Sequence, residues 1–382
     1  MMIEKIGKIF NEKFNQVPLI VRSPGRVNII GEHTDYNDGF VLPAAIDKAI
    51  YVAMAKRDDA MIHLFAIEFN ESFSININDI HPTKSWSTYI LGVVNQLVDR
   101  GYKIGGFNLV IDGDVPVGAG LSSSAAVECS VVFALNELFN LNIDKMQMVL
   151  IAQKAEQTYS GVMCGVMDMF ASMFGKKNHV IKLDCRSLEY QYKPLIFDGY
   201  KLVLFNTNVK HSLASSAYNE RRQQCEQGVA WVASHYPNIK SLRDVNLEML
   251  QQIVLPKDAL IYTRCKFVVE EIERLLTGCN DLENGNIVSL GKKMFQTHNG
   301  LSKEYGVSCA ELDFLVNAVS ENKNVLGSRM MGGGFGGCTI NIIHEHSVDE
   351  ITEKLFSSYK KELGLQLTSY IVNTSNGTSI VK

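Results

Sequence analysis

The sequence of 382 residues lacks several features that would assign it to a functional class at once. Its 8 cysteines include no Cys-x-x-Cys pair, so a zinc ribbon or a thioredoxin-like redox motif has no support. Lys and Arg number 37 against 41 Asp and Glu, and the formal charge of −4 lacks the basic excess of a general nucleic-acid binder. No apolar run approaches the roughly 18 residues that a membrane span needs. The sequence therefore predicts neither a nucleic-acid nor a membrane partner, and it leaves room for a small cationic pocket.

The beginning of the chain, MMIEKIGKIFNEKF, carries charges throughout and has no apolar segment like that of a secretory signal peptide. We therefore expect a cytoplasmic protein whose cysteines are free thiols in a reducing compartment. The oligomeric state has no signal in the sequence, and a monomer is the working expectation. Hydrophobic residues make up 46% and charged residues 20%, which is typical of a globular chain and excludes a disordered one.

The apolar pattern changes along the chain from a mixture of strands and helices to a helix-rich second half. Strands are predicted over 21–30, 49–56, 106–112, 180–184, 201–206, 338–343 and 367–373. Helices are predicted over 5–15, 122–139, 144–159, 167–174, 214–235, 246–253, 263–277, 285–299, 309–320 and 348–363. Because strands and helices mix without a regular βαβ repeat, the predicted fold class is α+β. The length suggests two domains, which we place at 1–190 and 191–382, with the boundary within 185–200.

Residues 23–39, SPGRVNIIGEHTDYNDG, concentrate polar side chains directly after an apolar strand. A sugar-like ligand needs several acceptors and a fixed cation at one place, because each of its hydroxyls both donates and accepts. An exposed turn would tolerate the same composition, so both interpretations stay open at this point. Among three glycines, the segment carries six polar residues that could serve such a ligand, namely Arg26, Asn28, Glu32, His33, Asp35 and Asp38.

Residues 116–126, PVGAGLSSSAA, form a glycine- and serine-rich segment that runs straight into a predicted helix. Free backbone N–H groups and the positive end of the helix dipole favour a bound anion there, and a serine hydroxyl can add a Mg²⁺ ligand. The Gly-Lys-Ser/Thr end of a Walker A loop is missing. An ordinary serine cap after a glycine turn is the alternative, but three serines with two glycines favour the phosphate site.

Residues 330–338, MMGGGFGGC, place five glycines in six positions ahead of a predicted strand. A dinucleotide-binding fingerprint would follow a strand and open a helix, so the order excludes a Rossmann motif. The glycines indicate a close backbone approach to another part of the molecule. Taken alone, the segment is more typical of a structural loop between domains.

Two acidic residues lie between these segments. Asp168 falls near the predicted start of a short apolar helix, where the helix dipole favours the carboxylate form that suits a base. An ordinary helix-start aspartate is the alternative for Asp168, and an exposed helical position is the alternative for Glu156.

Taken in this order, the three segments resemble the three motifs of the GHMP small-molecule kinases. The first has the form typical of the galactokinase family, Gly-Arg-x-Asn-Ile-Ile-Gly-Glu-His-x-Asp-Tyr. Four further segments resemble that family, namely WSTYILGV at 86–93, CGVMD at 164–168, HSLASSAYNERR at 211–222 and VSCAELD at 307–313. The resemblance covers most of the chain. It implies ATP-dependent phosphorylation of the anomeric C1 hydroxyl of α-D-galactose to galactose 1-phosphate, in the Leloir pathway of galactose catabolism.

The resemblance also implies roles for individual residues. Asp168 matches the family's catalytic base, and Arg26 matches the arginine beside it. The positions that hold the sugar are matched by Glu32, His33, Asp35, Gly165 and Tyr218. The phosphate loop is matched by Pro116, Gly118, Ala119, Gly120, Leu121, Ser122, Ser123 and Ser124, the Mg²⁺ ligands by Ser124 and Glu156, and the adenine site by Trp86 and Tyr89. The implied cofactors are therefore ATP and Mg²⁺, and the implied small-molecule partner is galactose.

The implied architecture is the two-domain GHMP kinase fold, an N-terminal domain like domain 2 of ribosomal protein S5 followed by a ferredoxin-like C-terminal domain. One departure is Met169, where the family often has Gln beside the base. The nearest rival is another GHMP sugar kinase, such as an N-acetylgalactosamine kinase, which would differ in the space around the sugar C2. A non-catalytic galactose sensor would have an altered phosphate loop, whereas 122–126 keeps the family form. A nucleotide-binding module without kinase activity is disfavoured on the same ground.

Overall fold

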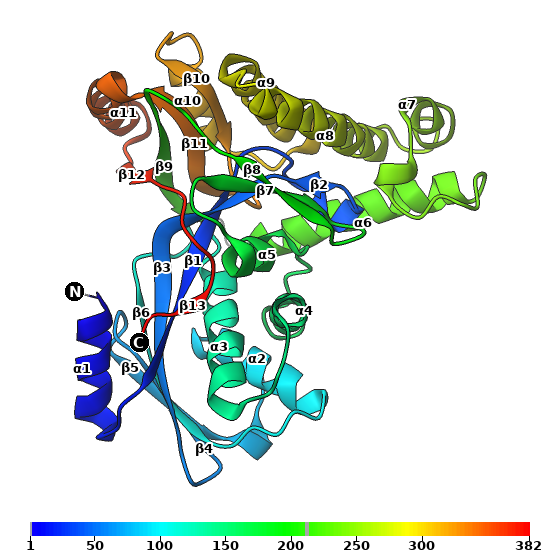
Figure 1. Ribbon diagram of the computed structural model, residues 1–382. Helices are drawn as coiled ribbons and strands as arrows, with labels where there is room; N and C mark the ends of the chain where they lie inside the picture. Colours follow the sequence, from blue (N-terminus) through cyan, green and yellow to red (C-terminus); the bar gives the residue numbers. More distant parts are fainter. Residues whose placement is uncertain (1, 211–213) are drawn as a thin grey trace.

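The computed structural model describes residues 2–210 and 214–382, and it divides into two halves (Figure 1). Residues 211–213, which begin the segment HSLASSAYNERR, lie outside the described residues. The first half contains a six-stranded sheet, the second a four-stranded sheet, and a small three-stranded sheet lies between them. Within the described ranges, each helix is too short or too polar to cross a membrane.

The six-stranded sheet has the order β13-β1-β3-β6-β4-β5, and only β4 and β6 run parallel. Strand β13 comes from the far end of the sequence to pair with β1, and the Ile20 N–H donates to Lys382 O at 2.8 Å. The two ends of the chain therefore both lie beside this sheet (Figure 1). Its strands are β1 (Leu19–Asn28), β3 (Pro43–Lys56), β4 (Met61–Ala66), β5 (Glu71–Asn76), β6 (Phe107–Gly113) and β13 (Ser379–Ile380).

The two faces of this sheet are covered by different helices because alternate side chains of a strand point to opposite faces. On one face Ile20 packs with Ile6 and Phe10 of α1 (Met2–Phe14). On the other face Val21 belongs to the main hydrophobic core. That core is closed by α2 (Ser87–Asp99), α3 (Ser123–Phe139), α4 (Lys145–Ala155) and α5 (Met167–Phe174).

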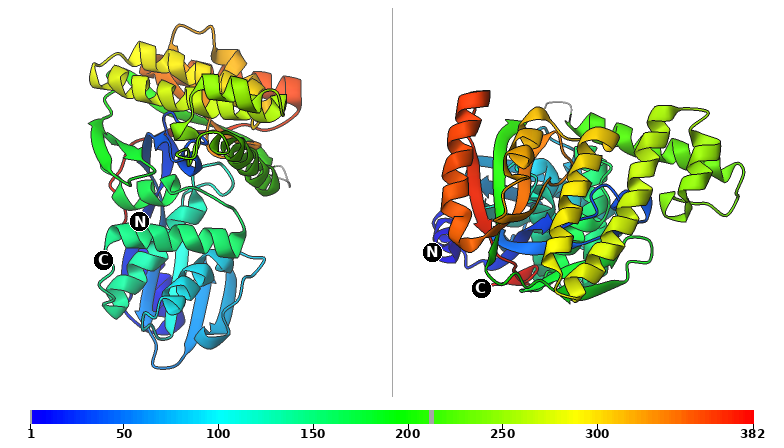
Figure 2. Two further views of the ribbon diagram at one scale, coloured as in Figure 1. Left: turned by 90° about the vertical axis from the view of Figure 1, so that its right-hand side faces the viewer. Right: turned by 90° about the horizontal axis from the view of Figure 1, so that it is seen from above.

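The second half packs helices against a sheet of order β10-β11-β9-β12. Seen from above, α11 lies at one end of this half and α6 and α7 extend from the other (Figure 2). The strands are β9 (Tyr200–Lys210), β10 (Val325–Met330), β11 (Gly336–His344) and β12 (Thr368–Val372). The helices are α6 (Ala214–Ala233), α7 (Leu247–Met249), α8 (Ala259–Glu283), α9 (Ile287–Asn299), α10 (Ala310–Val319) and α11 (Val348–Leu363). The small sheet has the order β2-β7-β8, with β2 (Phe40–Val41), β7 (His179–Asp184) and β8 (Tyr190–Pro194).

Every strand and helix predicted from the sequence is present, with ends shifted by a few residues in most cases. The sequence did not reveal β2, β4, β5, α2, β8, β10 or β13. Strand β10 changes the interpretation of the glycine-rich segment 330–338, which connects two antiparallel strands and does not merely precede one. Helix α4 runs into a π-helical turn, η3 (Glu156–Ser160), and the exposed position considered for Glu156 is wrong because this residue is buried.

Candidate active site

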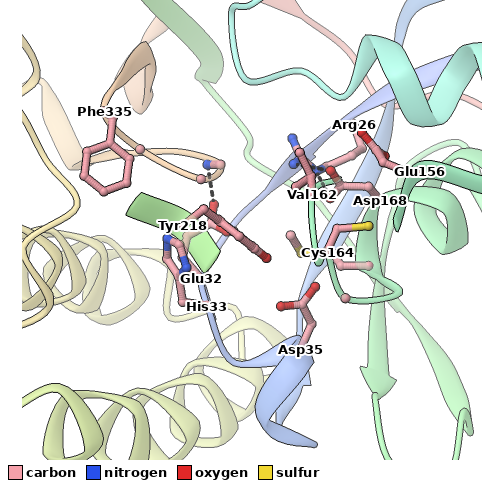
Figure 3. A pocket seen from close by; sticks show the side chains of 15 residues that line it. Arg26, Glu32, His33, Asp35, Glu156, Val162, Cys164, Asp168, Tyr218 and Phe335 are labelled. Carbon is pink, nitrogen blue, oxygen red and sulfur yellow. Dashed lines mark hydrogen bonds and ion pairs between the residues drawn. The ribbon is translucent and has the colours of Figure 1, made fainter. Parts of the chain in front are cut away.

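A cavity of about 250 Å³ lies between the two halves (Figure 3). It opens where β1 ends, where α5 begins and where the glycine-rich β10–β11 loop crosses from the second half. All of the residues predicted to act on or hold the sugar line it, together with Glu156. The lining is Arg26, Glu32, His33, Asp35, Glu156, Val162, Cys164, Gly165, Met167, Asp168, Tyr218, Gly332, Gly333, Gly334 and Phe335.

Asp168, the second residue of α5, is held by two partners. Arg26 of β1 donates from Nε to Oδ1 at 2.8 Å and from Nη2 to Oδ2 at 2.9 Å. Ser122 donates from Oγ to Oδ2 at 2.5 Å. The Asp168 side chain is 26% exposed, whereas that of Arg26 is 4% exposed and lies behind it. The carboxylate therefore faces the cavity with its orientation set from the protein side.

The glycine- and serine-rich loop brings Ser122 to that contact. Ser122 occupies the position before α3 with φ of +58°, and its side chain does not cap the helix. The ordinary serine cap considered from the sequence is therefore absent at Ser122. Gly120, two residues before Ser122, has a φ of +77° and accepts a hydrogen bond from Arg26 Nη1 through its carbonyl oxygen. The loop thus joins the start of α3 to the Arg26–Asp168 pair.

Asp35 lies across the cavity from this pair (Figure 3). Burial, followed by the negative charge of Asp168, raises the pKa of Asp35 to about 7. Its Oδ1 accepts from the Tyr36 N–H at 3.0 Å, and its Oδ2 lies against Gly165. A Cβ added to Gly165 would stand 2.0 Å from that oxygen, so only glycine leaves room for the carboxylate.

His33 is an uncharged hydrogen-bonding side chain at neutral pH. Burial lowers the pKa of its imidazole to about 4. Its Nδ1 lies 2.7 Å from the Tyr36 hydroxyl, which in turn lies 2.8 Å from the hydroxyl of Tyr305. The ring also packs against Tyr218 with centroids 5.3 Å apart, so the imidazole is fixed on several sides.

The glycine-rich β10–β11 loop lies against the Pro116–Leu121 loop of the first half. A Cβ added to Gly332, where φ is +80°, would meet Gly120 O at 3.3 Å. A Cβ added to Gly334 would stand 2.1 Å from Val307 O. The close backbone approach expected from the glycines is confirmed, and the loop is more than a structural connection because it also lines the cavity.

A second, more apolar cavity of about 120 Å³ lies beside the start of α3. Trp86 and Tyr89, the two residues matched to the family's adenine site, line it, and Val117, Ser123 and Ser124 complete the side nearest the loop. The indole Nε1 of Trp86 donates to Glu71 Oε2 at 3.0 Å. Ser124 belongs to this cavity and stands beside Glu156, which belongs to the first one. A ligand with a flat apolar end and a charged tail could therefore run from one cavity to the other.

Two buried carboxyl groups, Glu156 and Glu128, lie near Ser124. Burial raises the pKa of Glu156 to about 7. Glu128, one turn further along α3, is fully buried, and neither of its carboxylate oxygens has a hydrogen-bond partner in the described chain. The described residues contain no group of three or more His, Cys, Asp or Glu side chains arranged to hold a metal alone. Mg²⁺ is commonly bound by one or two protein ligands plus substrate phosphates, so Ser124 and Glu156 fit it.

Three family models match this chain. A galactokinase galactose-binding signature matches residues 8–56, the GHMP kinases N terminal domain matches 88–176, and the GHMP kinases C terminal model matches 280–361. The galactokinase of Thermotoga petrophila is 40% identical over 94% of this chain and 98% of that protein. The galactokinase of Clostridium acetobutylicum is 38% identical over 99% of this chain and 97% of that protein. The chain belongs to the galactokinase family of the GHMP kinases.

Solved structures agree with membership of the galactokinase family. The crystal structure of Lactococcus lactis galactokinase complexed with galactose matches with a TM-score of 0.95 and 32% identity, over 99% of this chain and 100% of that one. Methanococcus jannaschii mevalonate kinase, at 18% identity and a TM-score of 0.64, is alike in fold alone. The predicted α+β, two-domain GHMP kinase fold is confirmed, and so is the prediction of an ATP-dependent kinase.

Several residues around the site of this galactokinase-family chain were not singled out from the sequence. Val162, Met167 and Phe335 line the cavity. Their side chains are apolar, so the sequence offered no reason to select them as site residues. The contact of Ser122 with Asp168 was not foreseen, although the loop was. Glu128 reads as an ordinary helical glutamate, and only its burial distinguishes it.

Proposed function

We propose that this enzyme transfers the γ-phosphoryl group of ATP to the anomeric C1 hydroxyl of α-D-galactose and forms galactose 1-phosphate. The observation that carries the proposal is the convergence, in one cavity, of the Arg26–Asp168 pair with Glu32 and Asp35 of the galactokinase signature. The Lactococcus lactis galactokinase that matches this chain was solved with galactose bound. A small polyhydroxylated substrate suits a cavity of about 250 Å³ lined by acceptors on several sides.

Asp168 acts as the base in this proposal. Its partly exposed carboxylate accepts the proton of the C1 hydroxyl as that oxygen attacks phosphorus, while Arg26 and Ser122 fix its orientation. Arg26 also places a fixed positive charge beside the reacting atoms, where it stabilises the negative charge that develops on the phosphoryl oxygens.

The sugar is held by the remaining lining residues. Glu32 and Asp35 accept hydrogen bonds from sugar hydroxyls, and neutral His33 adds a ring nitrogen. Gly165 leaves space for Asp35, and Tyr218 closes the cavity from α6. Recognition by several acceptors aligns C1 with Asp168.

The nucleotide lies across both cavities in this proposal. Trp86 and Tyr89 hold the adenine by apolar contact. The backbone N–H groups of the phosphate loop and the start of α3 hold the phosphates. These loop residues are Pro116, Gly118, Ala119, Gly120, Leu121, Ser122, Ser123 and Ser124.

Ser124 and Glu156 would hold Mg²⁺ next to the phosphates. The metal supplies positive charge that offsets the negative charge of the triphosphate during transfer. Glu156 is then needed as a carboxylate, so a bound cation would lower its pKa from about 7.

We also propose a division into domains 1–190 and 191–382, a monomeric state and a cytoplasmic location. The distribution of strands supports the division, because the four-stranded sheet draws only on residues 200–372. Two strands are exceptions: β13 returns to the first sheet, and β8 crosses the boundary and pairs with β7.

A coupled ADP-release assay across galactose, N-acetylgalactosamine, glucose and arabinose tests the function, with ³¹P NMR to identify the phosphorylated carbon. Galactose is expected to give the highest kcat/KM and a 1-phosphate product. A preference for N-acetylgalactosamine would replace the proposal with the rival kinase, and binding of galactose without ADP release would support a sensor.

A further inference from the structure

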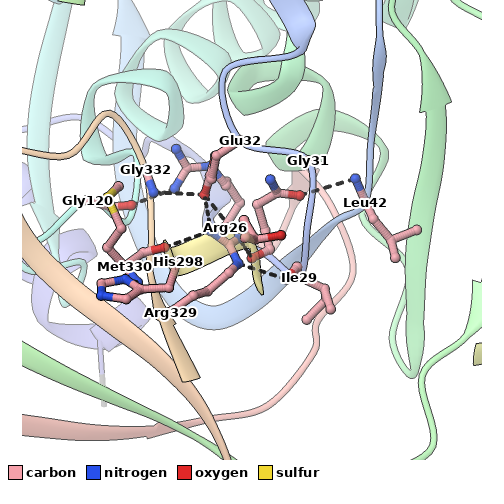
Figure 4. Close-up of polar contacts among 12 residues, drawn as sticks. Arg26, Ile29, Gly31, Glu32, Leu42, Gly120, His298, Arg329, Met330 and Gly332 are labelled. Carbon is pink, nitrogen blue, oxygen red and sulfur yellow. Dashed lines mark hydrogen bonds and ion pairs between the residues drawn. The ribbon is translucent and has the colours of Figure 1, made fainter. Parts of the chain in front are cut away.

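Arg329 is a fully buried arginine whose guanidinium reaches from β10 into the first half of the molecule (Figure 4). Nε donates to Ile29 O at 2.9 Å, Nη1 donates to Met330 O at 2.7 Å, and Nη2 donates to Asn28 O. Nη1 and Nη2 also donate to Glu32 Oε1, at 3.2 and 3.1 Å. All five N–H donors of the guanidinium thus have a partner.

Glu32 is held through one of its two carboxylate oxygens. Oε1 accepts both bonds from Arg329 and a third from the Gly332 N–H at 2.8 Å. Glu32 also lines the cavity proposed to bind the sugar. Because the three donors all take Oε1, Oε2 is the oxygen available to a ligand, and rotation of the carboxylate would break three hydrogen bonds at once.

This geometry depends on an arginine at 329. Lysine has three donors on a single nitrogen and cannot serve backbone acceptors on two strands and a carboxylate at the same time. Without the guanidinium, Glu32 would be a buried carboxylate that keeps a single backbone donor, Gly332. Such a group turns toward other donors or takes up a proton, and either change removes a defined acceptor from the cavity.

We propose that Arg329 is a positioning residue for sugar recognition. It fixes Glu32 Oε1 so that Oε2 accepts a hydrogen bond from one particular hydroxyl of the sugar, and Arg329 itself does not touch the substrate. The inference rests on the proposed galactose kinase function and adds to it. It assigns part of the sugar selectivity of Glu32, which lies in the first half of the molecule, to Arg329, which lies in the second half.

The test compares galactose with its 2-, 3-, 4- and 6-deoxy analogues in wild type, Glu32→Gln and Arg329→Lys, with kcat and KM measured separately for sugar and ATP. In wild type, loss of the hydroxyl bound by Glu32 is expected to reduce kcat/KM by about tenfold or more, the usual effect of a hydrogen bond to a charged group. We call the fold loss in kcat/KM on removal of one hydroxyl the penalty at that position. Glu32→Gln identifies the hydroxyl bound by Glu32, because the penalty at that position shrinks in this variant. Arg329→Lys should shrink the penalty at the same hydroxyl to below about threefold, leave the other penalties unchanged and keep KM for ATP near the wild-type value.

Arg243→Lys is the matched control, because Arg243 also contacts a carboxylate, that of Asp184, with both Nη atoms and lies outside the cavity. Its deoxy-sugar pattern should equal that of wild type. A uniform loss at every position in Arg329→Lys, or an unchanged pattern, overturns the inference and leaves Arg329 as a structural residue. If wild type does not phosphorylate galactose, the proposed function fails instead, so the two failures are distinguishable.

A crystal structure of wild type with galactose supplies a second test that requires no variant to fold. The expected result is a sugar hydroxyl on Glu32 Oε2 while Oε1 keeps Arg329 and Gly332. A sugar bound through Oε1, or one that does not contact Glu32, contradicts the inference.

Discussion

Arg26 and Asp168 meet through two parallel hydrogen bonds, from Nε to Oδ1 at 2.8 Å and from Nη2 to Oδ2 at 2.9 Å. The third nitrogen of Arg26, Nη1, donates a hydrogen bond to Gly120 O. One guanidinium therefore connects the proposed base to the loop proposed to hold the phosphates. Replacement of Asp168 or Arg26 is expected to lower kcat more than it weakens ligand binding.

Asp168→Asn should abolish most of the phosphoryl transfer while ATP still binds. The amide cannot take up the hydroxyl proton, and general-base catalysis usually contributes about 10²–10⁴ in rate. Stopped assays for ADP measure kcat, and calorimetry measures the Kd for ATP. Asp258→Asn is the control, because it replaces another aspartate at a helix start with a residue that caps equally well. If Asp168→Asn turned over as fast as wild type, Asp168 would not be the catalytic base.

Arg26→Lys should lower kcat far more than it weakens galactose binding. Lysine cannot reproduce two parallel bonds to Asp168 and a third to Gly120, so the base and the loop lose their shared support. We expect a loss of about tenfold or more in kcat, with the Kd for galactose changed only a few-fold. If only the affinity changes, Arg26 is a binding residue rather than part of the catalytic pair.

Gly165→Ala should weaken galactose binding through Asp35. The added Cβ would stand 2.0 Å from Asp35 Oδ2, so the carboxylate has to move from its place in the cavity. An increase of about tenfold in KM for galactose, with KM for ATP unchanged, is expected for one displaced hydrogen-bonding group. Gly105→Ala is the control, since the Cβ there would meet nothing nearer than 3.6 Å. Equal sugar KM values in the two variants would contradict the role given to Gly165.

Galactose binding should weaken as the pH falls below about 7. Asp35 has a pKa of about 7, so it becomes neutral on the acid side and loses an acceptor for a sugar hydroxyl. Titration calorimetry without nucleotide or Mg²⁺ should show the Kd rising by up to about tenfold per pH unit below 7. In Asp35→Asn the Kd should be weak and almost independent of pH. A wild-type Kd that does not change between pH 5.5 and 8 would refute this prediction.

Glu128→Gln should stabilise the metal-free protein, and more so as the pH rises. Burial, followed by the charges of Glu156 and Asp168, raises the pKa of Glu128 well above its ordinary value. The folded state then keeps a proton that the unfolded state has already lost, so the wild-type free energy of unfolding falls with pH above the ordinary pKa of a glutamate. The slope of this term is about 1.4 kcal/mol per pH unit, and Gln does not contribute it. Urea unfolding in EDTA at pH 5 and pH 8 should show the variant gaining relative to wild type, and a difference that does not vary with pH would argue against it.

The sequence revealed the parts of the site that depend on local patterns. Ser122–Ser124 could be placed at the start of a helix because glycines and serines precede an apolar periodic stretch, and Asp168 could be placed at the start of α5 for a similar reason. Gly165 and Tyr218 were reached only through the family resemblance, since neither has a composition that marks it.

The remaining features depend on contacts between distant parts of the chain. Arg329 meets Ile29, which lies 300 residues earlier, and nothing around 329 indicates that partner. The burial of Glu128 follows from the packing of α3 between the sheet and α4, and the apolar residues of α3 do not form a single stripe from which an inward face could be predicted. Strand β13 has two residues, too few to show an alternating pattern.

The pairing of β13 with β1 also has a kinetic consequence. While the chain is being synthesised, β1 can pair with β3 early, but its other edge stays open until residues near 380 have emerged. An open edge can pair with another nascent chain, and closing a loop of almost the full sequence is entropically slow. We therefore expect the yield of folded protein to be more sensitive than its final stability to changes at the β13 segment, with aggregation as the competing outcome.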